Sequence, residues 1–284
     1  MNQIMFYGPG SAPAGEYRPA DSGVSGNARR WRPPGPPSRW ALFLDVDGTL
    51  IDLAPRPDLI RPPGGLVPLI RRLRRQLGGA LAVVTGRALA DVDRILCDPT
   101  IPGAGQHGAE LRLPGGRRRD AQIPAALAAA RAAIRAEGFA PAPLLVEDKG
   151  ATIAIHYRAA PRHAPALRRA LAALVPAGGP LALLAGHALF ELKPRAVGKH
   201  AAVAALMAVA PFRGRLPIFV GDDVTDRDGF AEVERRGGYA VHVRPLQYGS
   251  RNPNLFLRSP SEVRAWLRFL LWRRPGEDED EPCP

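Results

Sequence analysis

The chain has 284 residues, 46% of them hydrophobic, which suffices for one large or two modest domains with a buried core. Its net charge of +12 is spread along the chain, and only 6% of residues are aromatic. The sequence has no basic run interleaved with aromatic residues, the pattern typical of proteins that bind single-stranded nucleic acid. With two cysteines, no apolar signal core and no unbroken apolar run of about 18 residues, the sequence predicts a cytoplasmic protein without a disulfide framework or a membrane span.

The first third of the chain predicts an arm followed by alternating strands and helices. Residues 1–38 are rich in Gly, Pro, Ser and Arg without periodicity, which predicts a disordered arm. Apolar runs and amphipathic stretches then predict a strand, a helix, a strand, a helix and a short strand with a turn, over 41–45, 64–77, 80–84, about 89–96 and 104–111. This alternation is typical of a parallel sheet with crossover helices.

The pattern changes near residue 110. An Ala-rich helix, two strands, a second helix and two more strands are predicted over 123–137, 144–147, 151–158, 164–175, 181–184 and 188–192. A helix followed by two strands, occurring twice, predicts an inserted α+β domain over 110–192.

The first pattern resumes after residue 192. Helices over 198–210 and 226–236 alternate with strands over 216–220 and 239–243, and a last helix begins with Ser259 as N-cap, Pro260 at N1 and Glu262 completing a capping box. The predicted division is therefore an α/β core over 39–109 and 193–273, the inserted domain, and a disordered acidic tail over 274–284.

The octet Phe43 to Leu50 ends the first strand with two carboxylates, Asp45 and Asp47, followed by Gly48. Sites in open α/β sheets lie beyond the carboxyl ends of strands, and side chains at i and i+2 share a side while the chain stays extended. Both carboxylates can thus face one pocket beside a tight backbone turn. The structural alternative is a strand that ends in an Asx-rich turn.

Polar clusters follow four predicted elements of the core: Asp45 with Asp47, Thr85, Lys199, and Asp222 with Asp223 and Asp226. Carboxylates that meet from separate strands stay ionised together only with a cation between them, and a few hard oxygen ligands suit Mg²⁺. A carboxylate can also attack phosphorus, while a lysine and a hydroxyl hold the phosphoryl oxygens.

The order of these clusters resembles the haloacid-dehalogenase (HAD) phosphohydrolases. The resemblance implies Asp45 as nucleophile, Asp47 as general acid/base and Thr85 and Lys199 as phosphate-binding groups. It also implies a Rossmann-like core with a C2-type cap, and a Mg²⁺ site of Asp45, Asp47 through its backbone carbonyl, Asp222 and Asp223. A helix N-cap is the alternative role for Asp223.

Five motifs narrow the resemblance to the trehalose-6-phosphate phosphatases: His107–Leu111, Glu147–Gly150, His156–Arg158, Phe190–Pro194 and Gly221–Phe230. The implied activity is Mg²⁺-dependent hydrolysis of trehalose 6-phosphate by a monomer, with neither nucleic acid nor membrane as partner and a trehalose-phosphate synthase as a candidate protein partner. The implied substrate-binding residues are Gly86, Arg87, His107, Glu147, Lys149, Arg158, Glu191 and Lys193.

Several of these residues have structural alternatives. Glu147 and Lys149 can form a solvated hairpin pair, His156 and Arg158 can lie on the outer face of the inserted sheet, and His107 can be a turn histidine. Two positions also depart from the family pattern. Arg227 stands where Glu is usual, and His200 stands where Gly usually follows the third-motif lysine.

Lysine is rare in this chain. Only three of the 39 basic residues are lysines, Lys149, Lys193 and Lys199, and all three fall in the motifs above. Because lysine is a compact point charge and arginine a broad planar fork, we predict that arginine does not fit at Lys199, beside Asp45 and a phosphoryl group. The alternative is that the three lysines are retained by chance.

Three alternatives to the implied function are kept. The first is another capped sugar-phosphate phosphatase, of the sucrose-phosphate or mannosyl-phosphoglycerate type. The second is a catalytically silent relative that binds a synthase, against which the intact acidic and lysine positions speak. The third is a nucleic-acid binder, which rests on charge alone.

Overall fold

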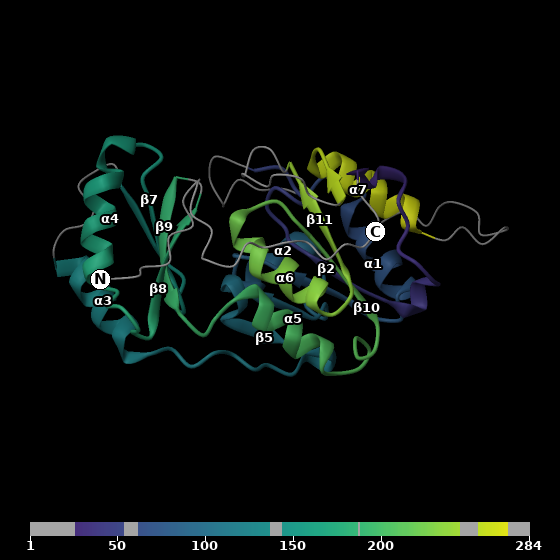
Figure 1. Cartoon of the computed structure of the whole chain (residues 1–284), viewed down its shortest axis with the longest axis horizontal. Coiled ribbons are helices and arrows are strands. Elements are labelled where there is room, and N and C mark those ends of the chain that lie inside the picture. Colours follow the sequence, from purple (N-terminus) through teal and green to yellow (C-terminus); the bar gives the residue numbers. More distant parts are fainter. Residues whose placement is uncertain (1–25, 54–61, 137–143, 187, 245–254, 272–284) are drawn as a thin grey trace.

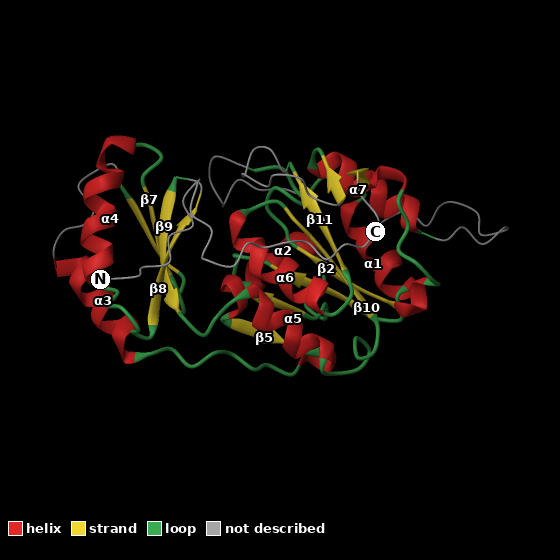
Figure 2. Ribbon diagram, viewed as in Figure 1, coloured by secondary structure: helices red, strands yellow, loops and turns green. Residues whose placement is uncertain are grey.

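The structure is a computed structural model that describes residues 26–53, 62–136, 144–186, 188–244 and 255–271. Figures 1 and 2 show two lobes side by side, a larger core and a smaller cap, each built on its own sheet. The fold is α/β with a mainly parallel core sheet, as the sequence predicts. Residues 1–25 of the predicted arm and the predicted acidic tail over 274–284 lie outside the described residues.

Within the described residues, the core sheet has eight strands in the order β1-β12-β11-β10-β2-β3-β4-β5. Their bounds are Gly26–Asn27, Leu255–Leu257, Tyr239–Val243, Leu216–Gly221, Trp40–Leu44, Leu81–Val84, Gly103–Gly105 and Glu110–Arg112. All neighbours are parallel except β4 and β5. The central strand β2 is buried on both faces, which explains why it reads as an unbroken apolar run.

Helices cover both faces of the core sheet. α1 (Leu66–Gln76), α2 (Leu89–Leu96) and α7 (Pro260–Leu270) share a hydrophobic cluster with Leu42 and Leu44. On the other face, α5 (Lys199–Met207) and α6 (Arg227–Arg235) share a cluster with Ala41 and Phe43. The alternation of side chains along β2 thus feeds both halves of the core.

The segment before β2 is ordered from residue 26 onward, which differs from the disordered arm predicted over 1–38. β1 pairs with β12, and Trp31 stacks on Trp266 of α7 at 6.2 Å between ring centroids. The Trp266 Nε1 also donates a hydrogen bond of 2.9 Å to the Trp31 carbonyl. Local composition does not reveal this order, because the partner of Trp31 lies more than 200 residues away.

The cap has an antiparallel sheet in the order β6-β7-β9-β8, with bounds Leu145–Asp148, Ile153–His156, Leu189–Pro194 and Leu181–Gly186. Helices α3 (Ala125–Ala136) and α4 (Ala164–Ala173) share its hydrophobic cluster, which includes Ile153, Ile155 and Leu192. The opposite face of this sheet carries Glu147, Ala154 and Glu191 in register.

The boundaries of the cap differ from the predicted 110–192. β5, over Glu110–Arg112, pairs with β4 in the core sheet, and β9 continues in the cap sheet to Pro194. The short strand predicted over 104–111 is instead β4, a 3₁₀ turn and β5, because the chain reverses at Gln106–Gly108.

Short 3₁₀ helices complete the described fold, at Ala28–Arg30, Pro37–Arg39, Gln106–Gly108, Pro114–Gly116, Pro161–His163 and Val224–Asp226. α7 begins as predicted, with the Ser259 hydroxyl accepting from the Glu262 N–H at 3.2 Å. The predicted reciprocal bond is displaced by one residue, since the Glu262 carboxylate accepts from the Arg258 N–H. No described helix combines the length and the apolar character needed to cross a bilayer.

Candidate active site

The predicted catalytic side chains gather at one edge of the core sheet. Asp45 follows β2, Thr85 follows β3, Asp222 follows β10, and Lys199 is the first residue of α5. All four are buried, Lys199 to 2% exposure and Asp45 to 5%. Since β2 lies between β10 and β3, the loops that leave these strands are neighbours.

Lys199 ties two carboxylates together. Its Nζ donates to Asp45 Oδ1 at 2.9 Å and to Asp226 Oδ1 at 2.5 Å. Burial alone lowers the pKa of Lys199, but the charges of Asp226 and Asp45 outweigh it and raise that pKa above its usual range. The ammonium therefore stays charged beside the predicted nucleophile.

Asp226 has a role that the sequence analysis did not assign. Besides the bond from Lys199, its Oδ2 accepts the backbone N–H groups of Asp222 and Asp223 at 3.0 and 2.9 Å. It thus fixes the turn after β10 and the position of the lysine together. Its place in the acidic cluster Asp222/Asp223/Asp226 was the available signal, but its partners depend on the fold.

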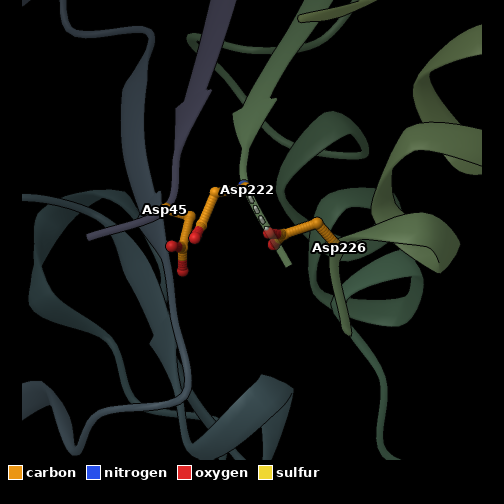
Figure 3. A group of neighbouring side chains, drawn as sticks. All are labelled: Asp45, Asp222 and Asp226. Atoms are coloured by element: carbon orange, nitrogen blue, oxygen red, sulfur yellow. Dashed lines mark hydrogen bonds between the residues drawn. The ribbon is translucent and has the colours of Figure 1, made fainter. Parts of the chain in front are cut away.

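Asp45, Asp222 and Asp226 form an acidic group in which one ligand oxygen from each lies within 4.8 Å of the others (Figure 3). Burial, only partly offset by Lys199, raises the pKa of Asp45 to about 7. Burial and then the charge of Asp45 raise the pKa of Asp222 to about 9. A cation would relieve this repulsion, so the donor set fits a hard divalent metal.

Asp223, predicted as a metal ligand, is engaged elsewhere. Its side chain caps the 3₁₀ helix Val224–Asp226 by accepting from the Val224 N–H at 2.7 Å. Its other oxygen accepts from the Thr225 hydroxyl at 3.3 Å. The alternative role of Asp223 as an N-cap describes this geometry, and the acidic group of the described residues does not include it.

Asp47 and Arg87 form a two-point ion pair. Arg87 Nε lies 2.6 Å from Asp47 Oδ2, and Nη2 lies 2.8 Å from Oδ1. Such a bidentate pair fixes the orientation of the carboxylate. Arg87 was predicted to bind substrate, whereas here it holds the predicted general acid/base.

Arg244 is a second residue that the sequence analysis missed. It follows β11, and its Nη2 donates to Asp222 Oδ2 at 3.0 Å and to the Gly48 carbonyl at 3.2 Å. It belongs to none of the motifs, so only the fold brings it to the site.

We expect Gly48→Ala to destroy the site. Gly48 has a φ of 75°, and an added Cβ would lie 2.1 Å from Asp222 Oδ2, so the acidic group would have to move. Gly64→Ala is the matched control, because a Cβ there meets nothing within 4 Å. Phosphatase activity and thermal unfolding of both variants check this, and wild-type activity in Gly48→Ala would contradict it.

The cap brings Glu191 to the core. Its Oε2 lies 2.8 Å from His107 Nε2, its Oε1 accepts from Thr152 Oγ1 at 2.7 Å, and Lys149 Nζ lies 3.6 Å away. Burial alone would raise the pKa of Glu191, but the neighbouring His107 and Lys149 lower it well below its usual range. The backbone N–H of His107 in turn donates to the Thr85 carbonyl at 2.9 Å, so the cap meets the loop after β3 here.

Gly86 and Glu147 complete the surroundings of His107 and Lys149. A Cβ on Gly86 would lie 2.7 Å from the His107 ring, so glycine permits the close approach of that histidine. Glu147 accepts from His156 Nε2 at 2.9 Å, and this hydrogen bond lowers the pKa of Glu147. Lys149 Nζ lies 3.9 Å from the same carboxylate. Glu147 thus lies on the face of the cap sheet opposite α3 and α4, here called its open face, and is paired with His156 and Lys149.

Two further predicted substrate-binding residues have different surroundings. Lys193 is buried and donates to the Val197 carbonyl at 2.7 Å, and burial lowers its pKa. Arg158 is exposed in the turn that follows β7. Its role in substrate binding stays a prediction.

The two departures from the family pattern are accommodated. His200 Nδ1 lies 3.0 Å from Asp228 Oδ2, and this hydrogen bond raises the pKa of His200. The imidazole is therefore paired with Asp228. The charge of Arg227 acts on His242. Burial, and after it the charge of Arg227, lowers the pKa of His242 to about 4.

The parallel core, the aspartate that follows its central strand and the cap inserted between β5 and α5 define a capped HAD phosphatase. Among solved structures, the C-terminal domain of C. albicans trehalose-6-phosphate phosphatase matches with a TM-score of 0.72 at 19% identity, covering 82% of this chain and 93% of that chain. An Aspergillus fumigatus trehalose-6-phosphate phosphatase matches with a TM-score of 0.56 at 20% identity, covering 82% of this chain and 92% of that chain. These likenesses support the fold.

Sequence comparisons give the family. The model of the trehalose-phosphatase family matches residues 43–262. A probable trehalose-phosphate phosphatase of Sinorhizobium fredii is 43% identical over 207 residues, 72% of this chain and 78% of that protein. The Escherichia coli trehalose-6-phosphate phosphatase is 35% identical over 234 residues, 82% of this chain and 87% of that protein. The chain belongs to the trehalose-phosphatase family.

Proposed function

We propose that this protein hydrolyses trehalose 6-phosphate to trehalose and phosphate through a phosphorylated Asp45. The observation that carries the proposal is the buried Asp45 beside the charged Lys199, at a sheet edge that the polar face of the cap approaches through Glu191. By their names, the E. coli relative is a trehalose-6-phosphate phosphatase and the S. fredii relative a probable trehalose-phosphate phosphatase.

In the first step, a carboxylate oxygen of Asp45 attacks phosphorus and the bond from phosphorus to the sugar oxygen breaks. The leaving oxygen takes the bonding electrons and receives a proton from Asp47, whose carboxylate Arg87 holds and must release at one oxygen for this step. Lys199, with its Nζ 2.9 Å from Asp45, and Thr85, which follows the neighbouring strand β3, would hold the phosphoryl oxygens. Water then attacks phosphorus and gives a proton to Asp47, and the bond from phosphorus to the Asp45 oxygen breaks, which frees the Asp45 carboxylate and phosphate.

We propose Mg²⁺ as the metal, held by Asp45, Asp222 and the backbone carbonyl of Asp47. When bound, it would neutralise negative charge on the phosphoryl group. Asp226 already accepts from Lys199 and two backbone N–H groups, so its role is to order these ligands.

The decisive assay measures phosphate release from trehalose 6-phosphate, sucrose 6-phosphate and mannosyl-phosphoglycerate, with Mg²⁺ and after treatment with EDTA. We expect trehalose 6-phosphate to have the highest kcat/KM, and EDTA to abolish turnover until Mg²⁺ is restored. A preference for either other sugar phosphate would replace the substrate, and no release from any of them would refute the phosphatase.

Sugar recognition is proposed for Glu147, Lys149 and Glu191, which share the open face and turn of the cap. We expect Glu147→Ala and Glu191→Ala to lower kcat/KM for trehalose 6-phosphate by about tenfold or more, because a sugar hydroxyl would lose the carboxylate to which it donates. A small aryl phosphate, which lacks the sugar, should be affected far less.

Arg169→Ala is the control within the cap, because Arg169 is exposed on α4, which packs on the other face of the cap sheet from Glu147 and Glu191. It should leave both activities unchanged. An equal loss on both substrates in Glu147→Ala and Glu191→Ala would remove recognition by the cap from the account.

We further propose that the enzyme acts as a monomer on a small molecule in the cytoplasm, rather than on nucleic acid or at a membrane. A trehalose-phosphate synthase is a candidate partner because it would supply the substrate. Light scattering of the purified protein, alone and mixed with such a synthase, tests the monomer and the partner together.

A further inference from the structure

Two adjacent residues between β4 and β5 have left-handed backbones although neither is glycine. Gln106 has a φ of 47° and His107 a φ of 58°. Such conformations cost free energy and persist where the surroundings demand them, often at functional sites. His107 meets Glu191 of the cap, but the mechanism above gives Gln106 no role, although its side chain is only 4% exposed.

The backbone of this pair is joined to the loop that follows β3 and carries Thr85 and Arg87, here called the phosphate loop. The Gln106 N–H donates to the Arg87 carbonyl at 2.8 Å, and the His107 N–H donates to the Thr85 carbonyl at 2.9 Å. The position of Gln106 is therefore set by the loop that carries Thr85 and Arg87.

The side chain of Gln106 is joined to the cap. Its Oε1 accepts from the Ala151 N–H at 3.2 Å, across the boundary between the two lobes. Its Nε2 donates to Glu110 Oε1 at 3.0 Å, and Glu110 Oε2 accepts from the Leu89 N–H at 2.6 Å. The amide is held at both ends, which fixes the direction in which its oxygen points.

Ala151 belongs to the turn that presents Lys149. Within the cap, Arg131 Nη2 donates to the Gly150 carbonyl at 2.6 Å, and the Ala151 N–H is shared with the Lys149 carbonyl at 3.1 Å. Gln106 provides a hydrogen bond to this turn from the core. Gln106 thus joins the turn of Lys149, through its side chain, to the loop of Thr85 and Arg87, through its backbone.

We propose that Gln106 is a positioning residue that sets the sugar-binding turn of the cap in register with the phosphate loop. This inference rests on the proposed function, since it assigns Gln106 to the alignment of a sugar phosphate whose two ends are bound by different lobes. A small aryl phosphate has no sugar for the cap to bind, so it does not need this alignment.

Gln106→Asn tests the proposal, because Asn tolerates the left-handed backbone at least as well as Gln but is one methylene too short to make both contacts. We expect kcat/KM for trehalose 6-phosphate to fall by about 10- to 100-fold, the range for a misaligned substrate. Activity on p-nitrophenyl phosphate should stay near wild type. The Ala151 amide should exchange hydrogen for deuterium faster, as measured on peptides covering 148–153.

Gln76→Asn is the matched control, because the Gln76 side chain also bonds a distant backbone group, donating to the Leu270 carbonyl in a part of the core away from the cap. It should change neither activity nor exchange at Ala151. An equal fall on both substrates, or no fall, in Gln106→Asn would overturn the inference. A wild type inactive on trehalose 6-phosphate would refute the proposed function instead, and unchanged exchange at Ala151 would still overturn the inference.

Discussion

Asp45→Asn is expected to lower the rate of phosphate release by at least about a thousandfold. Losses of this size are seen when a nucleophile that acts as a unit with its partners is removed. A carboxamide oxygen is a far poorer nucleophile than a carboxylate, and its shape is nearly the same. The amide oxygen can still accept from Lys199, so the fold should be kept.

Asp45→Asn should also make the stability of the metal-free fold less sensitive to a rise in pH. Burial raises the pKa of Asp45 in the folded protein to about 7, above its ordinary value of 3.8. The folded state therefore binds more protons between these values, and stability contributed by this group is lost as pH rises through that window. Without metal, Asp45→Asn should lose less stability than the wild type between pH 4 and pH 7, both read from the midpoint of thermal unfolding.

Asp52→Asn serves as the control for the loss of activity, because Asp52 is an exposed carboxylate in the same segment of the chain. It should turn over like the wild type. Removal of a nucleophile should leave about a thousandth of wild-type activity or less. If purified Asp45→Asn keeps as much as about a tenth, Asp45 is not the nucleophile.

Lys199→Arg should fail nearly as badly as Lys199→Ala. The ammonium lies within 2.9 Å of Asp45 and 2.5 Å of Asp226 in a site that leaves it 2% exposed, so a planar guanidinium needs room that the packed neighbours occupy. We expect kcat to fall by about 10²-fold or more, as when a transition-state charge partner is misplaced.

Arg72→Lys is the matched control for this exchange, since Arg72 is exposed on α1 and needs only a charge. It should keep wild-type kcat and stability. Steady-state kinetics of Lys199→Arg within a few fold of wild type would show that charge alone suffices at this position.

The sequence predicts most of the core because local signals agree there. The apolar runs end at Asp45, Thr85 and Asp222, and parallel topology brings the ends of such strands to one edge of the sheet. Lys199, at the start of a helix, follows the same logic. What these signals define is which loops carry chemistry.

Contacts between distant segments could not be predicted in this way. Arg244 reaches Asp222 from outside every motif. Asp226 is distinguished from Asp223 by the hydrogen bond from Lys199 and by the backbone N–H groups from which each accepts. Trp31 is ordered by Trp266, although its own neighbourhood has the composition of a disordered segment.

The most direct test of the account is a rapid acid quench of wild-type enzyme during turnover of trehalose 6-phosphate labelled in its phosphoryl group, with Mg²⁺ present. We predict a transient acid-stable label on the peptide that contains Asp45, which disappears as labelled phosphate is released and never forms in Asp45→Asn. Phosphate release without any label on that peptide, or label on another residue, would contradict the account.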